Sequence, residues 1–289
     1  MYAHSINYVP VDFIKAQVIG LSVSNFINNP MLSEPISIYS GELLTKTIYK
    51  YKNLSIKIFV NNNRIEFSGS LHTFYNNGLH NHNDFGKTQF KIAINRLYSE
   101  LNIKPKNLYL LHLEWGFNIK PPRDSNYIID SLIQHKSVNK TVSIDCKIEG
   151  KYSQFKHSDF ILKIYNKSQQ FKLNSELLRI EIKQTNWSKY RLKGIRTLND
   201  FINTDGSIFF NELLKQWERV IFFDIDNSKI DGYYKYQTTT FWNELRQNYS
   251  NKTFKYHFDK LKELNKEIGH NTQSSIIKAL QDKGNELQL

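Results

Sequence analysis

The sequence has 289 residues, enough for one large domain or two small ones, and its 40% hydrophobic and 14% aromatic content excludes a disordered or collagen-like chain. A single cysteine, Cys146, excludes an internal disulfide and a four-cysteine zinc site. Lys and Arg total 39 against 27 Asp and Glu, a formal net charge of +12 that favours a polyanionic partner such as nucleic acid.

Alternating and helical patterns predict the elements of the first half of the chain. Residues 38–70 alternate polar and apolar positions on either side of a triple-asparagine turn at 61–63, which predicts a β-hairpin. Residues 72–84 are rich in Asn, Gly and His and predict a loop, and apolar residues at helical spacing predict a helix at 88–101. Residues 108–119 form an apolar run that stops before two prolines, so we expect a central strand there.

The second half predicts further strands and then a helical end. Three alternating segments predict strands, at residues 140–151, 159–166 and 177–184. Helical spacing predicts short helices at residues 123–136, 198–203 and 210–220. Long helices are expected after Gly232, one of them ending at Gly269, with a last short helix around residues 276–287.

The order of these elements predicts the fold class. Strands with intercalated helices, followed by helices alone, are typical of an α+β fold built mainly on antiparallel strands. We therefore expect an antiparallel sheet covered by helices on one face, in a domain at residues 1–230, and a helical C-terminal region at 231–289.

Positive charge is concentrated between residues 145 and 193, where eleven basic residues stand against five acidic ones. Aromatic residues such as Phe155 and Tyr165 are interleaved with the basic ones, as in proteins that stack bases and pair phosphates. The pattern favours a nucleic-acid partner, and the alternative is a Lys- and Asn-rich composition without functional meaning.

Several common site types are missing from the sequence. It contains no G-x-x-x-x-G-K-[ST] phosphate loop, no strand-anchored G-x-G-x-x-G and no G-x-S-x-G nucleophile motif. Cys146 lies in a strand-like, basic context and is a poor candidate for a nucleophile. The loop at 72–84 contains four side chains that suit a divalent metal or serve as ordinary loop residues: His72, His80, His82 and Asp84.

Short motifs follow one another in a definite order from residue 65 to residue 181. Upstream, the strand-like segment 65–69 ends in Ser68-Gly69, and Glu114 and Asn118 stand four residues apart in the apolar run. Tyr152 is followed six and seven residues later by Ser158-Asp159. Two further motifs come after it: Lys163-Ile164-Tyr165-Asn166-Lys167 and Arg179-Ile180-Glu181.

In this order the motifs resemble those of the trans-acting rolling-circle replication initiators of small plasmids and filamentous phages. The resemblance spans roughly residues 55 to 200, and Glu114, Asn118 and Asn166 stand where the family has Asp. It implies a palm like that of Rep proteins and HUH endonucleases, which nicks and rejoins DNA through a 5′-phosphotyrosine. Tyr152 is then the nucleophile, with Tyr165 as the reserve nucleophile.

The resemblance also implies the partners of that tyrosine. Lys167 is implied as a catalytic group that orients or neutralises the phosphate. A divalent metal, Mg²⁺ or Mn²⁺, is implied, with ligands Glu114, Glu181 and Asn118. DNA contacts are implied for Lys156, Lys163, Arg179 and Lys183.

The ionisation and burial of these side chains limit the roles that they can take. A tyrosine hydroxyl has an unperturbed pKa of about 10, so attack at neutral pH needs cationic help. Glu114 is costly to bury unless it is paired or binds a metal, and otherwise it is an outward-facing residue of a one-sided strand. Glu181 alternates with Arg179 and Lys183, which also fits a solvated salt-bridged face. We expect Glu114 and Glu181 to share one face of the sheet.

The implied function is the initiation of rolling-circle replication of a plasmid or phage. The alternatives are a non-catalytic DNA-binding protein on the same fold, and a relaxase or transposon-mobilising nickase. The implied partners are single-stranded or supercoiled origin DNA and the host replicative helicase and polymerase. The helicase is implied because the sequence has no ATP-binding motif, and a homodimer is left open. No apolar stretch approaches the ~18 residues of a membrane helix and no signal peptide is recognisable, so we expect a protein of the bacterial cytoplasm without a membrane partner.

Overall fold

The structure of the chain is a computed structural model that describes residues 7–142, 150–225, 230–267 and 271–288. Cys146, Gly269 and much of the strand expected at 140–151 lie outside the described residues.

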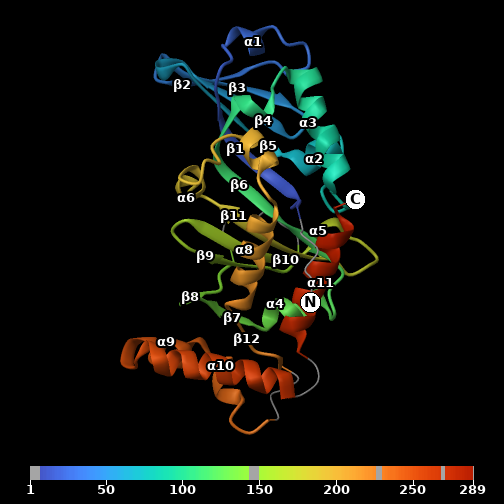
Figure 1. Cartoon of the computed structure of the whole chain (residues 1–289). Helices are drawn as coiled ribbons and strands as arrows, with labels where there is room; N and C mark the ends of the chain where they lie inside the picture. The colour runs from blue at the N-terminus through green and yellow to red at the C-terminus, as the bar shows by residue number, and fades with distance from the viewer. Residues whose placement is uncertain (1–6, 143–149, 226–229, 268–270, 289) are drawn as a thin grey trace.

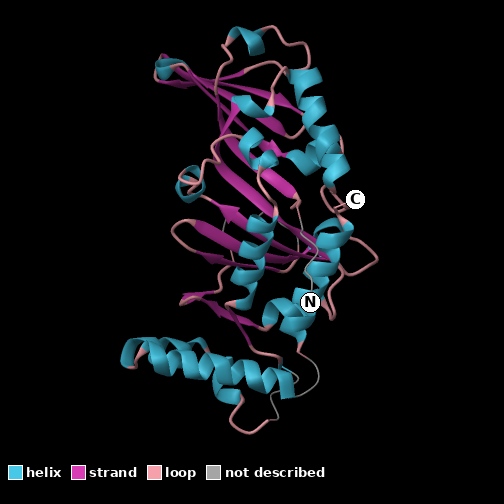
Figure 2. Cartoon of the chain, in the orientation of Figure 1, coloured by secondary structure: helices cyan, strands magenta, loops and turns pink. Residues whose placement is uncertain are grey.

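A nine-stranded sheet is the centre of the fold, and every neighbouring pair of its strands is antiparallel (Figures 1 and 2). Its order is β2-β3-β4-β5-β1-β6-β11-β10-β9. The strands are β1 (Val11–Val18), β2 (Ile36–Ser40), β3 (Leu43–Tyr51), β4 (Leu54–Phe59), β5 (Arg64–Ser70), β6 (Leu108–Ile119), β9 (Tyr152–Lys156), β10 (Phe160–Asn166) and β11 (Leu178–Gln184). A smaller sheet has the order β12-β7-β8 and comprises β7 (Leu132–His135), β8 (Val138–Asn139) and β12 (Val220–Phe222).

Helices cover one face of the large sheet. The α-helices are α1 (Ser24–Ile27), α2 (Leu71–Tyr75), α3 (Lys87–Leu101), α4 (Ser125–Asp130), α5 (Lys167–Phe171), α6 (Ser188–Arg191), α7 (Leu198–Asn203), α8 (Ser207–Glu218), α9 (Thr239–Asn248), α10 (Asn251–Glu267) and α11 (Thr272–Glu286). On β6 the aromatic rings of Trp115 and Phe117 pack edge-on against Phe209 and Phe210 of α8, with centroids 5.4 and 5.5 Å apart. Alternate residues of β6 therefore face the helices, and those between them face the opposite, polar side.

The C-terminal helices belong to two different cores. Helices α9 and α10 pack with β7 and β12 around Trp242, Tyr236 and Phe223 in a second hydrophobic cluster. Helix α11 instead returns to the main core, where Ile276 and Leu280 are fully buried (Figure 1). A division of the chain at residue 230 stays a prediction.

Most expected elements are confirmed. The strands at 108–119, 159–166 and 177–184 and the helices at 88–101 and 198–203 correspond to β6, β10, β11, α3 and α7 within a residue at either end. The α+β class with a mainly antiparallel sheet is also confirmed. No helix in the described part of the chain is both long and apolar enough to cross a membrane.

Three local expectations were wrong. The hairpin at 38–70 contains a further turn, with Lys52 at φ 53°, so β3 and β4 replace one strand. The loop at 72–84 begins in α2, which Ser70 caps by accepting a hydrogen bond from the Thr73 N–H. The helix at 123–136 ends at Asp130, and β7 follows, because a short apolar run that is buried on both sides also suits a strand.

His135, the last residue of β7, is fully buried, and its Nδ1 lies 2.7 Å from Nε2 of His157. Burial first, and then the nearby His157 and Lys136, lower the pKa of His135 to about 3. The unfolded chain therefore binds a proton near pH 6.5 that the folded chain does not bind until about pH 3. This imidazole contributes stability that is complete above pH 6.5 and is lost as the pH falls below it.

His135→Gln is expected to flatten the acid side of the stability profile, because glutamine has no charge to gain. This one histidine lowers the wild-type free energy of unfolding by at most about 1.4 kcal/mol per pH unit below its unfolded pKa. Urea denaturation at several pH values between 6.5 and about 4 measures the slope for both proteins. Equal slopes would contradict a neutral, buried imidazole.

Candidate active site

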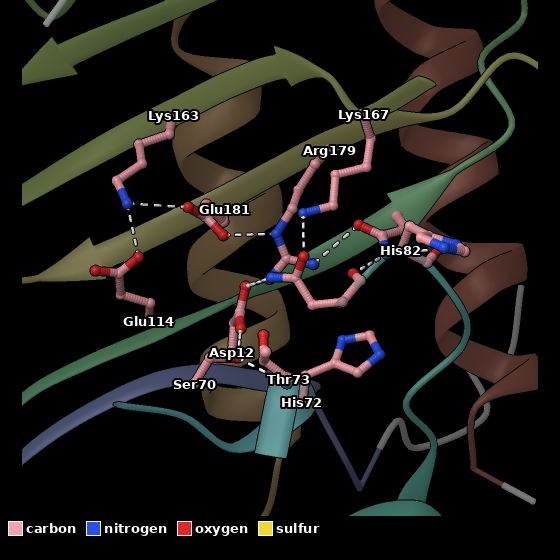
Figure 3. Close-up of polar contacts among 12 residues, drawn as sticks. Asp12, Ser70, His72, Thr73, His82, Glu114, Lys163, Lys167, Arg179 and Glu181 are labelled. Carbon is pink, nitrogen blue, oxygen red and sulfur yellow. Dashed lines mark hydrogen bonds and ion pairs between the residues drawn. The ribbon is translucent and has the colours of Figure 1, made fainter. Parts of the chain in front are cut away.

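Most of the predicted site residues lie on the polar face of the sheet because of the register of β6, β11, β10 and β9. Lys163 of β10 stands opposite Glu181 of β11, and Lys183 of β11 stands opposite Glu114 of β6. Side chains two residues apart on a strand share a face, so Glu114 and Glu181 lie on one face, as expected (Figure 3).

Lys163 lies between the two glutamates. Its Nζ is 2.6 Å from Oε2 of Glu114 and 3.0 Å from Oε1 of Glu181. Burial alone would lower the pKa of Lys163, but the carboxylates of Glu181 and Glu114 outweigh it and raise this pKa well above its usual value. The ammonium group is therefore a permanent positive charge that bridges β6 and β11.

Arg179 forms the second half of the ionic cluster, and it is only 1% exposed. Its Nε lies 2.6 Å from Oε2 of Glu181, its Nη1 donates to Oδ1 of Asn118 over 2.9 Å, and its Nη2 lies 3.3 Å from Oδ2 of Asp12. Burial raises the pKa of Glu181, yet Lys163 and Arg179 outweigh burial and hold that pKa well below its usual range.

Asp12 is a member of the cluster that the sequence patterns do not reveal. It lies on β1, next to a register shift between Val11 and Ile14 against β6, and a β-bulge of this kind can turn a side chain to the other face. Its carboxylate accepts hydrogen bonds from the Ser70 hydroxyl and from Asn81 Nδ2. The alternation of residues 11–18 could have revealed a strand, but not the bulge.

Lys167 follows β10 at the start of α5 and is fully buried. Its Nζ donates to Oδ1 of Asn81 over 2.6 Å and lies near the rings of Tyr165 and Phe171. Burial first, and then the charge of Arg179, lower the pKa of Lys167 to about 7. Its amine can therefore gain or lose a proton near neutral pH, which a lysine in water cannot do.

The two candidate nucleophiles are neighbours in the sheet. Tyr152 and Tyr165 stand opposite each other on β9 and β10, with ring centroids 5.8 Å apart. The Tyr152 hydroxyl donates to Oε1 of Gln154 over 2.7 Å. Burial and then Glu181 raise the pKa of Tyr165 well above its usual value, so Tyr165 ionises less readily than a free tyrosine. Tyr152 is 6% exposed and Tyr165 is 4% exposed.

The four residues expected to bind DNA differ in exposure. Lys156 is exposed at the end of β9, and the Lys183 side chain is 30% exposed, with its Nζ 3.0 Å from Oε1 of Glu114. Lys163 and Arg179 are held in the ion pairs of the cluster. Contacts of all four with phosphate stay predictions.

The expected metal ligands are all bonded to cations. Both oxygens of Glu114 face lysines, Lys163 and Lys183, and both oxygens of Glu181 face Lys163 and Arg179. In the described residues, no group of three or more His, Cys, Asp or Glu side chains is placed to hold a metal ion. As they are arranged, the residues do not fit a resident Mg²⁺ or Mn²⁺.

The histidine loop is likewise arranged without a metal ligand set in the part of the chain that the structure describes. The rings of His80 and His82 stack with centroids 4.0 Å apart, and Nε2 of His72 lies 2.7 Å from Oδ1 of Asn83. The carboxylate of Asp84 lies 2.9 Å from the ammonium group of Lys283 on α11.

Gly116 lies on β6 between Glu114 and Asn118, opposite Glu181. A Cβ at this position would lie 2.3 Å from the Ile180 carbonyl oxygen and 2.4 Å from Cβ of Glu181. The missing side chain therefore allows β6 and β11 to approach closely enough for the cluster to form.

Gly116→Ala is expected to lower the free energy of unfolding by about 1–3 kcal/mol, because backbone atoms must move to accept the methyl group. Urea denaturation measures the change. A variant as stable as the wild type would show that β6 and β11 can separate here without cost.

No family model matches the chain, and no curated protein matches its sequence significantly. Among solved structures, the chain is similar to that of the rolling circle replication initiator protein from Geobacillus stearothermophilus, with 13% sequence identity and a TM-score of 0.44. The alignment covers 87% of this chain and 95% of that chain.

Proposed function

We propose that this protein is an origin-specific DNA nicking and joining enzyme that initiates rolling-circle replication of a plasmid or phage. One observation carries the proposal. Residues of the motifs that resemble the initiator family, from Glu114 to Glu181, share one face of the sheet, where a pair of tyrosines stands beside an ion-paired cluster that contains Lys163 and Arg179. Tyrosine supplies the nucleophile and the cations supply the charge that a phosphodiester requires.

In the proposed reaction, the Tyr152 oxygen attacks the scissile phosphorus. The bond between phosphorus and the 3′-oxygen breaks, which leaves a 5′-phosphotyrosine and a free 3′-hydroxyl. The tyrosine gives up one proton and the leaving 3′-oxygen takes one, so the step is balanced. Lys167, whose pKa of about 7 suits proton transfer at neutral pH, is the side chain that we assign to this exchange.

The covalent link explains how the strand can be rejoined without ATP. The phosphodiester energy is kept in the tyrosine ester, and attack by a 3′-hydroxyl restores the DNA strand. The helicase and polymerase of the host are then the implied partners for opening and copying the duplex. Because Tyr152 is only 6% exposed, binding of the DNA must also uncover its hydroxyl.

The decisive experiment tests for the covalent intermediate. Overlapping single-stranded oligonucleotides, labelled at the 3′ end, are made to cover both strands of the coding sequence and its flanks. The protein is incubated with each, with Mn²⁺ and separately with EDTA, and analysed on a denaturing gel. We expect one oligonucleotide to give a labelled protein band, because the 3′ fragment carries the 5′-phosphate that joins to tyrosine.

A second candidate function is a non-catalytic DNA-binding protein, and the burial of both tyrosines favours it. That candidate predicts retention of the same oligonucleotides in a native gel and no covalent band under any condition. A relaxase or mobilising nickase would give the band, but with DNA from a transfer origin or transposon end.

A further inference from the structure

We propose that the ammonium group of Lys163 takes the place of a divalent metal ion, so that the centre formed by Glu114 and Glu181 is built to work with a fixed organic cation. Its meaning for DNA cleavage rests on the proposed function, whereas its test does not.

The contacts of Lys163 resemble those of a bridging cation. A single Nζ atom contacts a carboxylate oxygen from each of two strands, at 2.6 Å on Glu114 and 3.0 Å on Glu181. Its three hydrogens suit such a role, because an ammonium group donates in three directions from one centre. Lys163 thus stands between the two carboxylates that a metal would have to share (Figure 3).

The remaining oxygens of the two carboxylates are occupied as well. Glu114 Oε1 lies 3.0 Å from the ammonium group of Lys183, and Glu181 Oε2 lies 2.6 Å from Arg179. Asn118, the third expected ligand, offers its amide oxygen to Arg179 over 2.9 Å. A metal ion could bind here only by displacing at least one of these cations.

Charge balance leads to the same conclusion. The connected ion pairs contain three carboxylates and three cations: Asp12, Glu114, Glu181, Lys163, Lys183 and Arg179. The set is neutral as it stands, and most of it is buried. A divalent ion added to it would leave two uncompensated positive charges in a poorly solvated place, which is strongly unfavourable.

For the proposed nicking reaction, the inference has a direct consequence. A lysine held by two carboxylates is already in position before DNA arrives, and it can stabilise charge on the scissile phosphate without an ion from solution. Adduct formation is then expected to be equally efficient in EDTA and in Mn²⁺.

Mn²⁺ binding tests the inference without DNA. Electron paramagnetic resonance measures free Mn²⁺ as the ion is titrated into the full chain. We expect no binding to the wild type that depends on Glu181. Lys163→Met should bind one ion per chain at least about tenfold more tightly than the wild type, because a buried positive charge has been removed from between two carboxylates.

Two further variants control the measurement. Lys163→Met combined with Glu181→Gln should lose the new binding, and Lys156→Met, at an exposed lysine on the neighbouring β9, should bind like the wild type. If Lys163→Met does not fold, Lys163→Gln is measured in its place, because glutamine keeps a polar group on a side chain of similar length.

Two results would overturn the inference. One is Mn²⁺ binding by the wild type that Glu181→Gln abolishes, since the metal would then displace the ammonium group. The other is a folded Lys163 variant that gains no Mn²⁺ binding, since the two carboxylates would then not form a cation site. Absence of a DNA adduct in both EDTA and Mn²⁺ would count against the proposed function alone.

Discussion

Tyr152→Phe is expected to abolish the covalent protein–DNA adduct, by about 10³-fold or more, because the substitution removes the attacking oxygen itself. DNA affinity should change little, since binding depends mainly on phosphate contacts with the cations of the site. The fold should tolerate the change at a cost of about 1 kcal/mol, the usual contribution of a hydrogen bond such as that to Gln154. Adduct formation is measured on a denaturing gel and affinity on a native gel, with the same oligonucleotide.

Tyr165→Phe is the matched control, because its ring lies opposite Tyr152 and is equally buried. Burial and Glu181 raise the pKa of Tyr165, so its hydroxyl ionises less readily than that of a free tyrosine. With Tyr152 as the nucleophile, the Tyr165→Phe variant should still form the adduct. The opposite result, with the adduct lost in Tyr165→Phe and kept in Tyr152→Phe, would move the nucleophile to Tyr165. Loss in both variants would show that both hydroxyl groups are needed for adduct formation.

Arg179→Met is expected to lower the free energy of unfolding by about 3–5 kcal/mol, the usual cost of removing one partner from a buried ion pair. Methionine fills a similar volume but cannot form the bonds that Arg179 makes with Glu181, Asp12 and Asn118. The two carboxylates would then stay buried with one cation fewer. Urea denaturation near neutral pH measures the loss.

Arg64→Met provides the comparison for this experiment. Arg64 also pairs with a carboxylate on the same sheet, at 3.2 Å from Glu66, but its side chain is 41% exposed. Water screens such a pair, so its removal should cost no more than about 1 kcal/mol. Equal losses in the two variants would mean that burial of Arg179 adds nothing to its ion pairs. Arg179→Lys should fall between them, because it keeps the charge and loses the planar fork.

The sequence predicts β10 and β11 of the site well because their two faces differ so sharply, whereas β9, which carries Tyr152, begins just after the strand expected at 140–151. On β11, Leu178, Ile180 and Ile182 alternate with Arg179 and Glu181, and such a pattern fits no other element. The helix expected at 123–136 was wrong beyond Asp130, where β7 follows. All of β7 is buried, and a short continuous apolar run has no periodicity that distinguishes a strand from a helix.

The partners within the site could not be predicted in the same way. The motifs single out Glu114, Lys163 and Glu181, but they do not show that one lysine contacts both glutamates. That contact depends on the register of β6, β11 and β10, which long-range packing sets. Asp12 joins the cluster through a bulge, and Asn81 joins it from an irregular loop, and neither feature leaves a periodic signal.

The place of β1 in the sheet has a consequence for synthesis of the protein. Among the strands that the structure describes, β1 is synthesised before the others, yet it lies in the middle of the sheet, between β5 and β6, which are made later. The cations that neutralise Asp12 and Glu114 come later still, on β10 and β11. A nascent or truncated chain that ends before β11 therefore holds carboxylates without their counter-charges and cannot complete the cluster. On the proposed function, an initiator built in this way is unable to cut its own replicon until synthesis has passed β11, which ends at Gln184.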